Sequence, residues 1–164
     1  EIHFKCVPHQ GKSDLDASVP KKLRAWRIPG DRFVIVRDND NAQCAQVKER
    51  YVQMCTQANR PDTLIRLVCQ ELEGWYLGDL QAMATAFNDP KLAEPSLRKR
   101  FIDPDSWQKP SIEVARLLPS FQKVSGAREM SAQLQAGQNQ SKSFEAFVNG
   151  VRRLAAEMGY QGIS

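Results

Sequence analysis

The sequence predicts an α/β fold: a mostly parallel sheet flanked by helices, followed by a helical C-terminal part. Two short apolar runs, 33–36 and 63–69, contain several β-branched residues and have the composition of strands buried on both faces of a parallel sheet. A stretch with apolar residues three and four positions apart follows each run. Such an alternation of strands and helices is typical of parallel sheets covered by helices.

Upstream of these runs, the sequence predicts one more strand and one more helix. Residues 2–7 alternate apolar and polar side chains, which is the period of a strand with one buried face. A helix is expected from about Asp14 or Ser18 to Trp26, with Pro20 tolerated in its first turn. The first half of the chain therefore has the predicted order strand, helix, strand, helix, strand, helix.

Two amphipathic helices complete this half. The first spans 43–58 and joins the two buried strands. The second spans about 71–87, and Gly78 is expected to interrupt it because glycine is a poor helix former. The second half has a different pattern. A long loop rich in proline and charge is expected over 88–110, and short helices are expected over 111–118, 126–134 and 143–158.

Composition and length exclude several classes of protein. The 164 residues are enough for one domain with its own core, and no run approaches the length of a membrane span. The formal net charge of +4 permits a polyanionic partner without requiring one. The cysteines form no C-x-x-C pair, so we interpret them as buried free thiols in a reducing, cytoplasmic compartment. They are Cys6, Cys44, Cys55 and Cys69.

The beginning of the chain suggests a piece of a longer protein. It starts at Glu1 without an initiator Met or a signal-peptide pattern, and it enters the predicted strand almost directly. We therefore expect one domain over 1–164 that lacks an N-terminal strand and helix.

Acidic residues follow both buried strands. Asp38 and Asp40 come just after the run at 33–36, and Glu71 and Glu73 come just after the next run. One helix joins these strands, and such a unit is nearly always right-handed and parallel. Both acidic pairs are therefore expected at the carboxyl edge of the sheet, where ligands bind in open α/β sheets.

Two interpretations of these acids stay open at this point. Carboxylates that crowd together raise each other's pKa unless a cation neutralises them, and hard oxygen ligands suit Mg²⁺ or Mn²⁺. Residues two apart on a helix point to different sides, so Glu71 and Glu73 are not both expected as ligands. Glu71 is preferred because it is nearer the end of the strand. Alternatively, the acids serve as helix caps and first-turn charges, with Asp40 or Asn41 capping the helix that follows.

Three basic side chains are candidates for phosphate contacts. Lys12 lies in a Gly-Lys-Ser sequence, but Cys6 stands where a phosphate loop needs glycine, so we exclude a P-loop NTPase. Lys123 and Arg128 lie in a segment expected to precede a helix, whose free N–H groups could help bind an anion. An exposed loop and a plain turn are the simpler alternatives.

Five segments together resemble the family called domain of unknown function 4276, and the resemblance covers essentially the whole chain. Members of that family resemble Toprim proteins, which have the metal-binding fold of topoisomerases and primases. The segments are HQGKSDL (9–15), RDND (37–40), QELEGWYLGD (70–79), KVSGAR (123–128) and SKSF (141–144).

The resemblance implies a site and a chemistry. The Asp-x-Asp of Toprim proteins is matched by Asp38 and Asp40, and Glu71 stands where a further acid would help. The Glu that Toprim proteins carry after an earlier strand has no match, because Glu1 begins a predicted strand. Mg²⁺ or Mn²⁺ held by the acids would promote phosphodiester chemistry on nucleic acid, with hydrolysis as the expected reaction. Lys12, Lys123 and Arg128 would hold phosphates.

Some members of the family are encoded near ABC-type ATPases, in bacterial neighbourhoods suggestive of defence. The resemblance therefore implies a possible ATPase partner. Two alternatives to a nuclease remain: a non-catalytic partner subunit of an ATPase or nucleic-acid complex, and a structural α/β domain whose acids cap helices.

Overall fold

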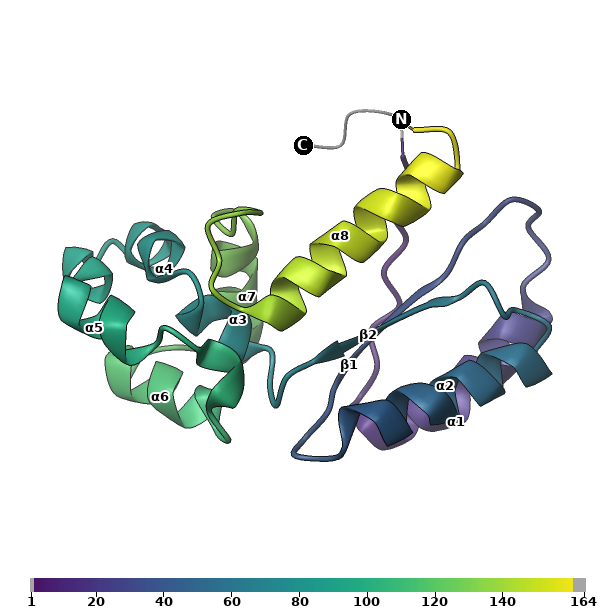
Figure 1. Ribbon diagram of the computed structural model, residues 1–164, viewed down its shortest axis with the longest axis horizontal. Helices are drawn as coiled ribbons and strands as arrows, with labels where there is room; N and C mark the ends of the chain where they lie inside the picture. The colour runs from purple at the N-terminus through teal and green to yellow at the C-terminus, as the bar shows by residue number, and fades with distance from the viewer. Residues whose placement is uncertain (1, 161–164) are drawn as a thin grey trace. The chain divides into compact units, whose positions relative to one another are not determined.

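The computed structural model describes residues 2–160, and in this range the chain forms two compact units (Figure 1). The first unit contains residues up to 37, residues 42–67 and residues from 147 onward. The second unit contains residues 38–41 and 68–146. The predicted α/β class is confirmed, with eight α-helices and one two-stranded parallel sheet in the described residues. That residues 1–164 form one Toprim-like domain stays a prediction.

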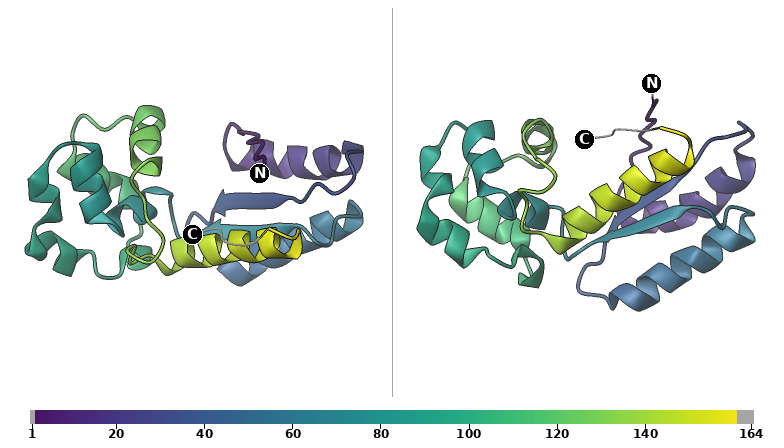
Figure 2. Two further views of the ribbon diagram at one scale, coloured as in Figure 1. Left: turned by 90° about the horizontal axis from the view of Figure 1, so that it is seen from above. Right: turned by 45° about the horizontal axis from the view of Figure 1, so that its top comes forward.

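The first unit packs helices on both faces of the sheet. The strands are β1 (Val34–Asp38) and β2 (Leu64–Val68), and α1 (Lys12–Ala25) and α2 (Cys44–Gln57) share a hydrophobic core with them. Figures 1 and 2 show α8 (Lys142–Glu157) on the opposite side of the strands from α1 and α2. The core residues of this unit are Val19, Leu23, Ile35, Tyr51, Cys55, Ala58 and Ile65.

Two backbone hydrogen bonds fix the register of the strands. The N–H of Leu64 donates to the carbonyl of Phe33 at 2.9 Å, and the N–H of Asn39 donates to the carbonyl of Val68 at 3.0 Å. Both bonds fit one parallel register, in which Asp38 lies beside Val68. The two strands therefore end side by side, as the strand–helix–strand order predicted.

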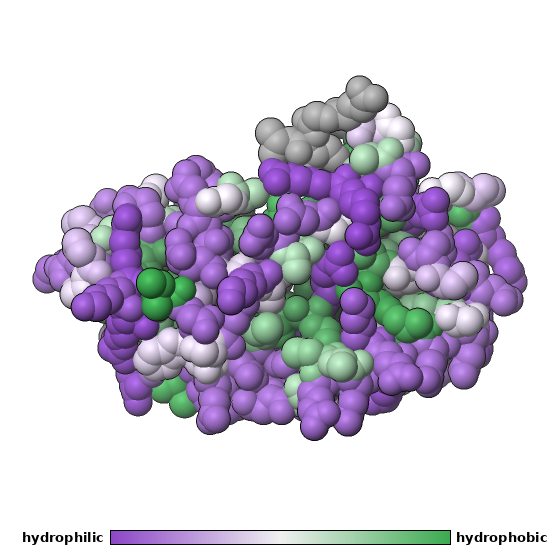
Figure 3. Space-filling view, in the orientation of Figure 1, coloured by the Kyte–Doolittle hydropathy of each residue, from purple (hydrophilic) through white to green (hydrophobic). Residues whose placement is uncertain are grey.

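The second unit consists of short helices joined by loops, together with the ends of both strands. Short helices, several of which begin with a proline, replace the long loop expected over 88–110. Proline is favoured at the first helical position. The elements are α3 (Glu73–Leu77), α4 (Leu80–Ala86), η1 (Pro90–Ala93), α5 (Pro95–Arg100), η2 (Pro104–Ser106), α6 (Pro110–Leu117) and α7 (Lys123–Ser131). On the face drawn in Figure 3, hydrophilic side chains cover most of these helices.

An aromatic cluster holds α7 in place in this unit. The ring of Phe121 lies 6.0 Å from that of Tyr76 and 5.8 Å from that of Phe87. Gly126 of α7 faces the same ring so closely that a Cβ atom at this position would overlap it. The absence of a side chain at 126 therefore allows the helix to approach the ring.

Hydrogen bonds to the carboxylate of Asp105 hold the start of α8. Its Oδ1 accepts from Ser141 Oγ at 2.7 Å, and its Oδ2 accepts from the N–H of Ser143 at 2.8 Å. Ser141 Oγ also accepts from the N–H of Phe144 at 3.1 Å, which is the geometry of a helix cap. Trp75 donates its ring N–H to Ser143 Oγ at 2.8 Å. The SKSF segment therefore anchors a helix to η2 and α3.

Two predicted elements of the first unit are wrong. Residues 2–9 form no strand, and the side chains of Phe4 and Val7 are exposed, so the alternating pattern buries no face there. Pro20 lies well inside α1, because Leu15 and Val19 continue the apolar spacing of Leu23 and extend the helix upstream. Glu1 lies outside the described residues.

Three further expectations are corrected or confirmed. The interruption at Gly78 is confirmed, since α3 ends before it and α4 begins after it. The prediction that all cysteines are buried is wrong for Cys6 and Cys44, which are exposed, whereas Cys55 is buried. In the residues that the structure describes, no helix is both long enough and apolar enough to cross a membrane.

Candidate functional site

The candidate site lies in the second unit, where β1 and β2 end. Asp38 is the last residue of β1, and the chain then turns through Asn39, Asp40 and Asn41. The N–H of Asp40 donates to the carbonyl of Gln70 at 3.3 Å, so the two strand ends stay paired beyond the sheet. This pairing places the residues after both strands next to each other.

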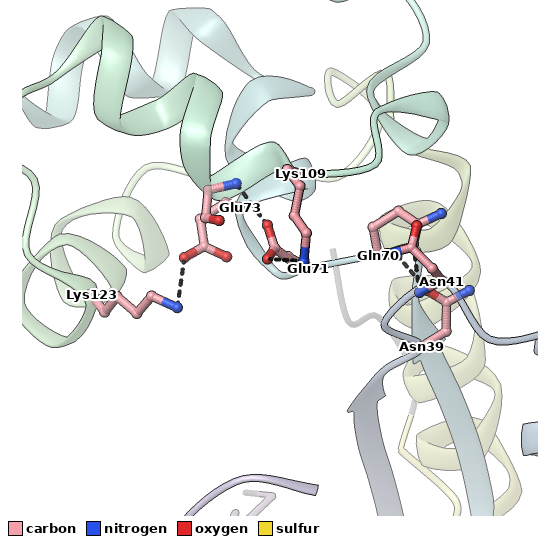
Figure 4. Close-up of polar contacts among 8 residues, drawn as sticks. Asn39, Asn41, Gln70, Glu71, Glu73, Lys109 and Lys123 are labelled. Atoms are coloured by element: carbon pink, nitrogen blue, oxygen red, sulfur yellow. Dashed lines mark hydrogen bonds and ion pairs between the residues drawn. The ribbon is translucent and has the colours of Figure 1, made fainter.

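Amide side chains fix the two loops together (Figure 4). Asn39 Oδ1 accepts from the N–H of Gln70 at 2.6 Å, and Gln70 Oε1 accepts from the N–H of Asn41 at 2.8 Å. Asp40, Asn41 and Gln70 all have positive φ angles, of 48°, 63° and 63°, a conformation that Asn and Asp tolerate better than most residues. These amide hydrogen bonds between the two loops were not predicted from the sequence, although the Asn on each side of Asp40 is a signal for such a turn.

We call Asp38, Asp40, Glu71 and Glu73 the acidic cluster. Burial is the main cause that raises the pKa of Asp38 to about 6, and the negative charges of Glu73, Asp40 and Glu71 raise it further, in that order. Lys123 has the opposite effect on the same pKa. The four predicted acids are therefore close enough to interact, and they leave an excess of negative charge around a half-buried carboxyl group.

Glu73 is the most buried acid of the cluster. It lies in the first turn of α3, only 7% exposed, and its Oε1 lies 3.7 Å from the ammonium group of Lys123 (Figure 4). Burial, together with the charges of Glu73 and Asp38, also raises the pKa of Tyr76. The predicted basic residue Lys123 thus contacts an acid of the cluster.

Glu71 has a structural role as well. Its Oε2 accepts a hydrogen bond from the N–H of Ser111 at 2.8 Å, and its Oε1 lies 3.9 Å from Lys109 Nζ. Ser111 is in the first turn of α6, so Glu71 caps a helix distant in sequence. Neither Lys109 nor Ser111 was singled out in the sequence, because nothing in their local pattern predicts contact with a residue some forty positions away.

The N-cap residue of α2 is Gln43, and its own side chain forms no capping hydrogen bond. Capping of α2 by Asp40 or Asn41 stays a prediction. The other predicted phosphate contacts are placed differently from expectation. Lys123 begins α7 and Arg128 lies in its last turn, so this segment is helix and not the loop before one. Lys12 lies in the first turn of α1, in the first unit.

The donor atoms of the acidic cluster suit a hard cation. Carboxylate oxygens are the usual protein ligands of Mg²⁺, which commonly binds through only one or two of them and keeps several waters. Within residues 2–160, no three His, Cys, Asp or Glu side chains are gathered tightly enough to hold one ion together. Among the charges around Asp38, that of Glu73 raises its pKa most.

A comparison with protein-family models gives one match. The model described as a domain of unknown function (DUF4276) matches residues 10–152, which include the whole acidic cluster. No curated protein and no solved structure matches the chain.

Proposed function

The chain belongs to the DUF4276 family of domains of unknown function, and we propose that it carries out divalent-metal-dependent phosphodiester chemistry on nucleic acid, as a nuclease of Toprim type. One observation carries the proposal: four carboxylates gather where two parallel strands end, and burial together with the charges of the other three raises the pKa of Asp38. Perturbed carboxyl groups at the carboxyl edge of a sheet are typical of functional sites.

Asp38 and Glu73 would hold Mg²⁺ or Mn²⁺, while Asp40 and Glu71 would add negative charge around it. When bound, such an ion supplies a Lewis acid for a phosphoryl oxygen and a more acidic water. Glu71 is the weaker candidate ligand, because its two oxygens already face Ser111 and Lys109. This ranking differs from the prediction made from the sequence, in which Glu71 was the preferred ligand.

The lysines of the site would bind the substrate backbone. The ammonium groups of Lys109 and Lys123 lie 3.9 and 3.7 Å from carboxylate oxygens of the cluster. Both side chains are largely exposed, so these ion pairs are weak and their lysines can turn toward phosphate oxygens. Arg128 and Lys12 remain predicted phosphate contacts. Cytoplasmic localisation remains an expectation from the cysteine pattern, and an ATPase partner in bacterial defence remains an expectation from the resemblance.

A second candidate is a non-catalytic subunit of an ATPase or nucleic-acid complex. It is favoured by the same ion pairs, since Lys123 and Lys109 partly neutralise the acids and could replace a metal ion. In that case the cluster would stabilise the second unit and the protein would bind its partner without cleaving nucleic acid.

Cleavage of nucleic acid tests the two candidates. The protein is incubated with supercoiled plasmid and with labelled single-stranded RNA, in Mg²⁺, Mn²⁺ or EDTA. The nuclease proposal predicts metal-dependent cleavage by the wild type and by Glu129→Gln, an exposed acid on α7 outside the cluster. It predicts loss of cleavage in Asp38→Asn and Glu73→Gln. Metal binding without cleavage of DNA or RNA would favour the non-catalytic subunit.

A further inference from the structure

The second unit contains a cavity that the acidic cluster does not line. It has a volume of about 370 Å³ and lies between the turn joining α3 to α4, the end of α5, and the loop before α8. This volume falls in the range of small-molecule sites, roughly 300–1,000 Å³. The polar residues in its wall are Asp79, Gln81, Arg98, Lys99, Gln138 and Gln140.

One wall of the cavity is held where the loop before α8 lies close to the backbone of the α3–α4 turn. The N–H of Gln140 donates to the carbonyl of Gly78 at 2.8 Å, and Asn139 Nδ2 donates to the carbonyl of Trp75 at 2.7 Å. A Cβ atom at Gly78 would overlap the side chain of Asn139, so only glycine admits the loop at this distance. The wall is therefore fixed by the α3–α4 turn.

A buried carboxylate in the wall has an unused oxygen. Asp79 is 4% exposed, and its Oδ1 caps α4 by accepting from the N–H of Ala82 at 2.9 Å. Its Oδ2 is buried and has no hydrogen-bond partner among the described side chains and backbone groups. Burying a charged acceptor without a donor is costly, and such atoms in native structures call for an explanation. A ligand with an N–H or O–H group would supply the missing donor.

The rim of the cavity carries the opposite charge. Arg98 and Lys99 are exposed on α5, and Arg98 donates to Oε1 of Gln81, another residue of the wall, at 2.8 Å. The adjacent Arg100 is used differently, since it pairs with Glu113 at 2.6 Å. Two cationic side chains at the rim favour an anionic group, and guanidinium is suited to phosphate.

We propose that this cavity binds a nucleotide, with the phosphate on Arg98 and Lys99 and a donor group of the base or ribose on Asp79. The nucleotide is either a free mononucleotide or the terminal nucleotide of a strand, since both present the same chemistry. Ile102, which is 68% exposed, adds apolar surface to the wall for a base. The inference does not require the acidic cluster to bind metal or to cleave nucleic acid.

Isothermal titration calorimetry in EDTA tests the inference without any contribution from the acidic cluster's metal. The probes are the four ribonucleoside monophosphates, 5′-phosphorylated tetranucleotides, nucleosides and inorganic phosphate. The wild type is expected to bind at least one phosphorylated nucleotide saturably, and more tightly than inorganic phosphate or the nucleoside. Binding of monophosphates assigns the cavity to free nucleotides, whereas binding of tetranucleotides alone assigns it to strand ends.

Three variants place the binding in this cavity. Arg98→Gln removes an exposed charge and should weaken binding about tenfold or more. Asp79→Asn keeps a side chain suited to capping α4 but loses an acceptor. This variant is expected to bind the nucleotide about as weakly as Arg98→Gln does. Lys91→Gln, an exposed charge outside the cavity wall, should bind as the wild type does. The inference is overturned if no phosphorylated probe binds saturably, if inorganic phosphate binds equally well, or if Arg98→Gln and Lys91→Gln behave alike.

Discussion

Glu71 accepts a hydrogen bond from the backbone N–H of Ser111 at 2.8 Å, so an acid that follows β2 also caps α6. A hydrogen bond to a charged group contributes roughly 1.5–3 kcal/mol, whereas an exposed ion pair contributes less than about 1 kcal/mol. The contact with Ser111 therefore outweighs the contact of Glu71 with Lys109, whose side chain is 59% exposed.

This difference gives the first prediction. Glu71→Ala should lower the free energy of unfolding by about 2 kcal/mol, because it leaves the N–H of Ser111 without its acceptor. Lys109→Ala, which removes only the ion pair, should change it by less than about 1 kcal/mol. Urea denaturation followed by circular dichroism measures both. Equal effects of the two variants would contradict the capping role of Glu71.

Stability should also depend on pH through Asp38. Its folded pKa is raised to about 6 from a usual value of 3.8, so the folded state binds this proton more tightly than the unfolded state does. Stability is therefore expected to fall as the pH rises from about 4 to about 6 and to stay level above that. Because Asp38 is partly exposed, the loss is of the order of 1–2 kcal/mol after solvent screening.

Asp38→Asn isolates this effect. The unfolding free energy of the variant minus that of the wild type should be larger at pH 7.5 than at pH 4.5. The reason is that the variant cannot acquire the unfavourable charge. Urea denaturation of both proteins at the two pH values gives the comparison. If the difference in unfolding free energy between them is the same at both pH values, the raised pKa of Asp38 is wrong.

Asp105 should be a strong determinant of stability in the second unit. Asp105→Ala removes the acceptors of Ser141 Oγ and the Ser143 N–H, and both serines are buried. Loss of a charged acceptor for both of these buried donors should cost about 2–4 kcal/mol. Asp103→Ala, which changes an exposed acid two residues away, should have little effect. A melting-temperature comparison separates the two, and similar values for both variants would refute the anchoring of α8.

Gly126 should resist substitution by alanine. In an ordinary helix interior this change would stabilise by about 1 kcal/mol. Here the added methyl group would overlap the Phe121 ring, and overpacking typically costs about 1–3 kcal/mol. Gly126→Ala should therefore be less stable than the wild type, whereas Ser125→Ala, at an exposed position on the same helix, should not be. Thermal denaturation that shows Gly126→Ala to be more stable would contradict this packing.

The sequence predicted the elements whose pattern is local and strong. The predicted apolar runs at 33–36 and 63–69 correspond to the strands at 34–38 and 64–68, and the apolar spacing of α2 predicted its bounds to within one residue. The single helix joining two buried strands was enough to predict that they are parallel, and therefore that the acids after them meet. The family resemblance is likewise confirmed, while the Toprim fold stays a prediction.

The remainder depends on contacts between segments distant in sequence. The pattern of residues 2–7 contained no information on whether a neighbouring strand would pair with it. The contacts of Glu71 with Ser111 and of Glu73 with Lys123 join residues some forty and fifty positions apart, beyond any local pattern. The unused oxygen of Asp79 became visible only when its surroundings were known, because a capping Asp has the same sequence signature whether or not its second oxygen is paired.

Titration of Mn²⁺ at pH 7.5, followed by calorimetry, tests the metal site most directly. We expect saturable binding to the wild type and to Glu129→Gln, and loss of that binding in Asp38→Asn and Glu73→Gln. At a hundred times its Kd the ion should add about 2.7 kcal/mol to the unfolding free energy of the wild type. Absence of binding to the wild type, or binding that Asp38→Asn leaves unchanged, would contradict a cation site at the ends of β1 and β2.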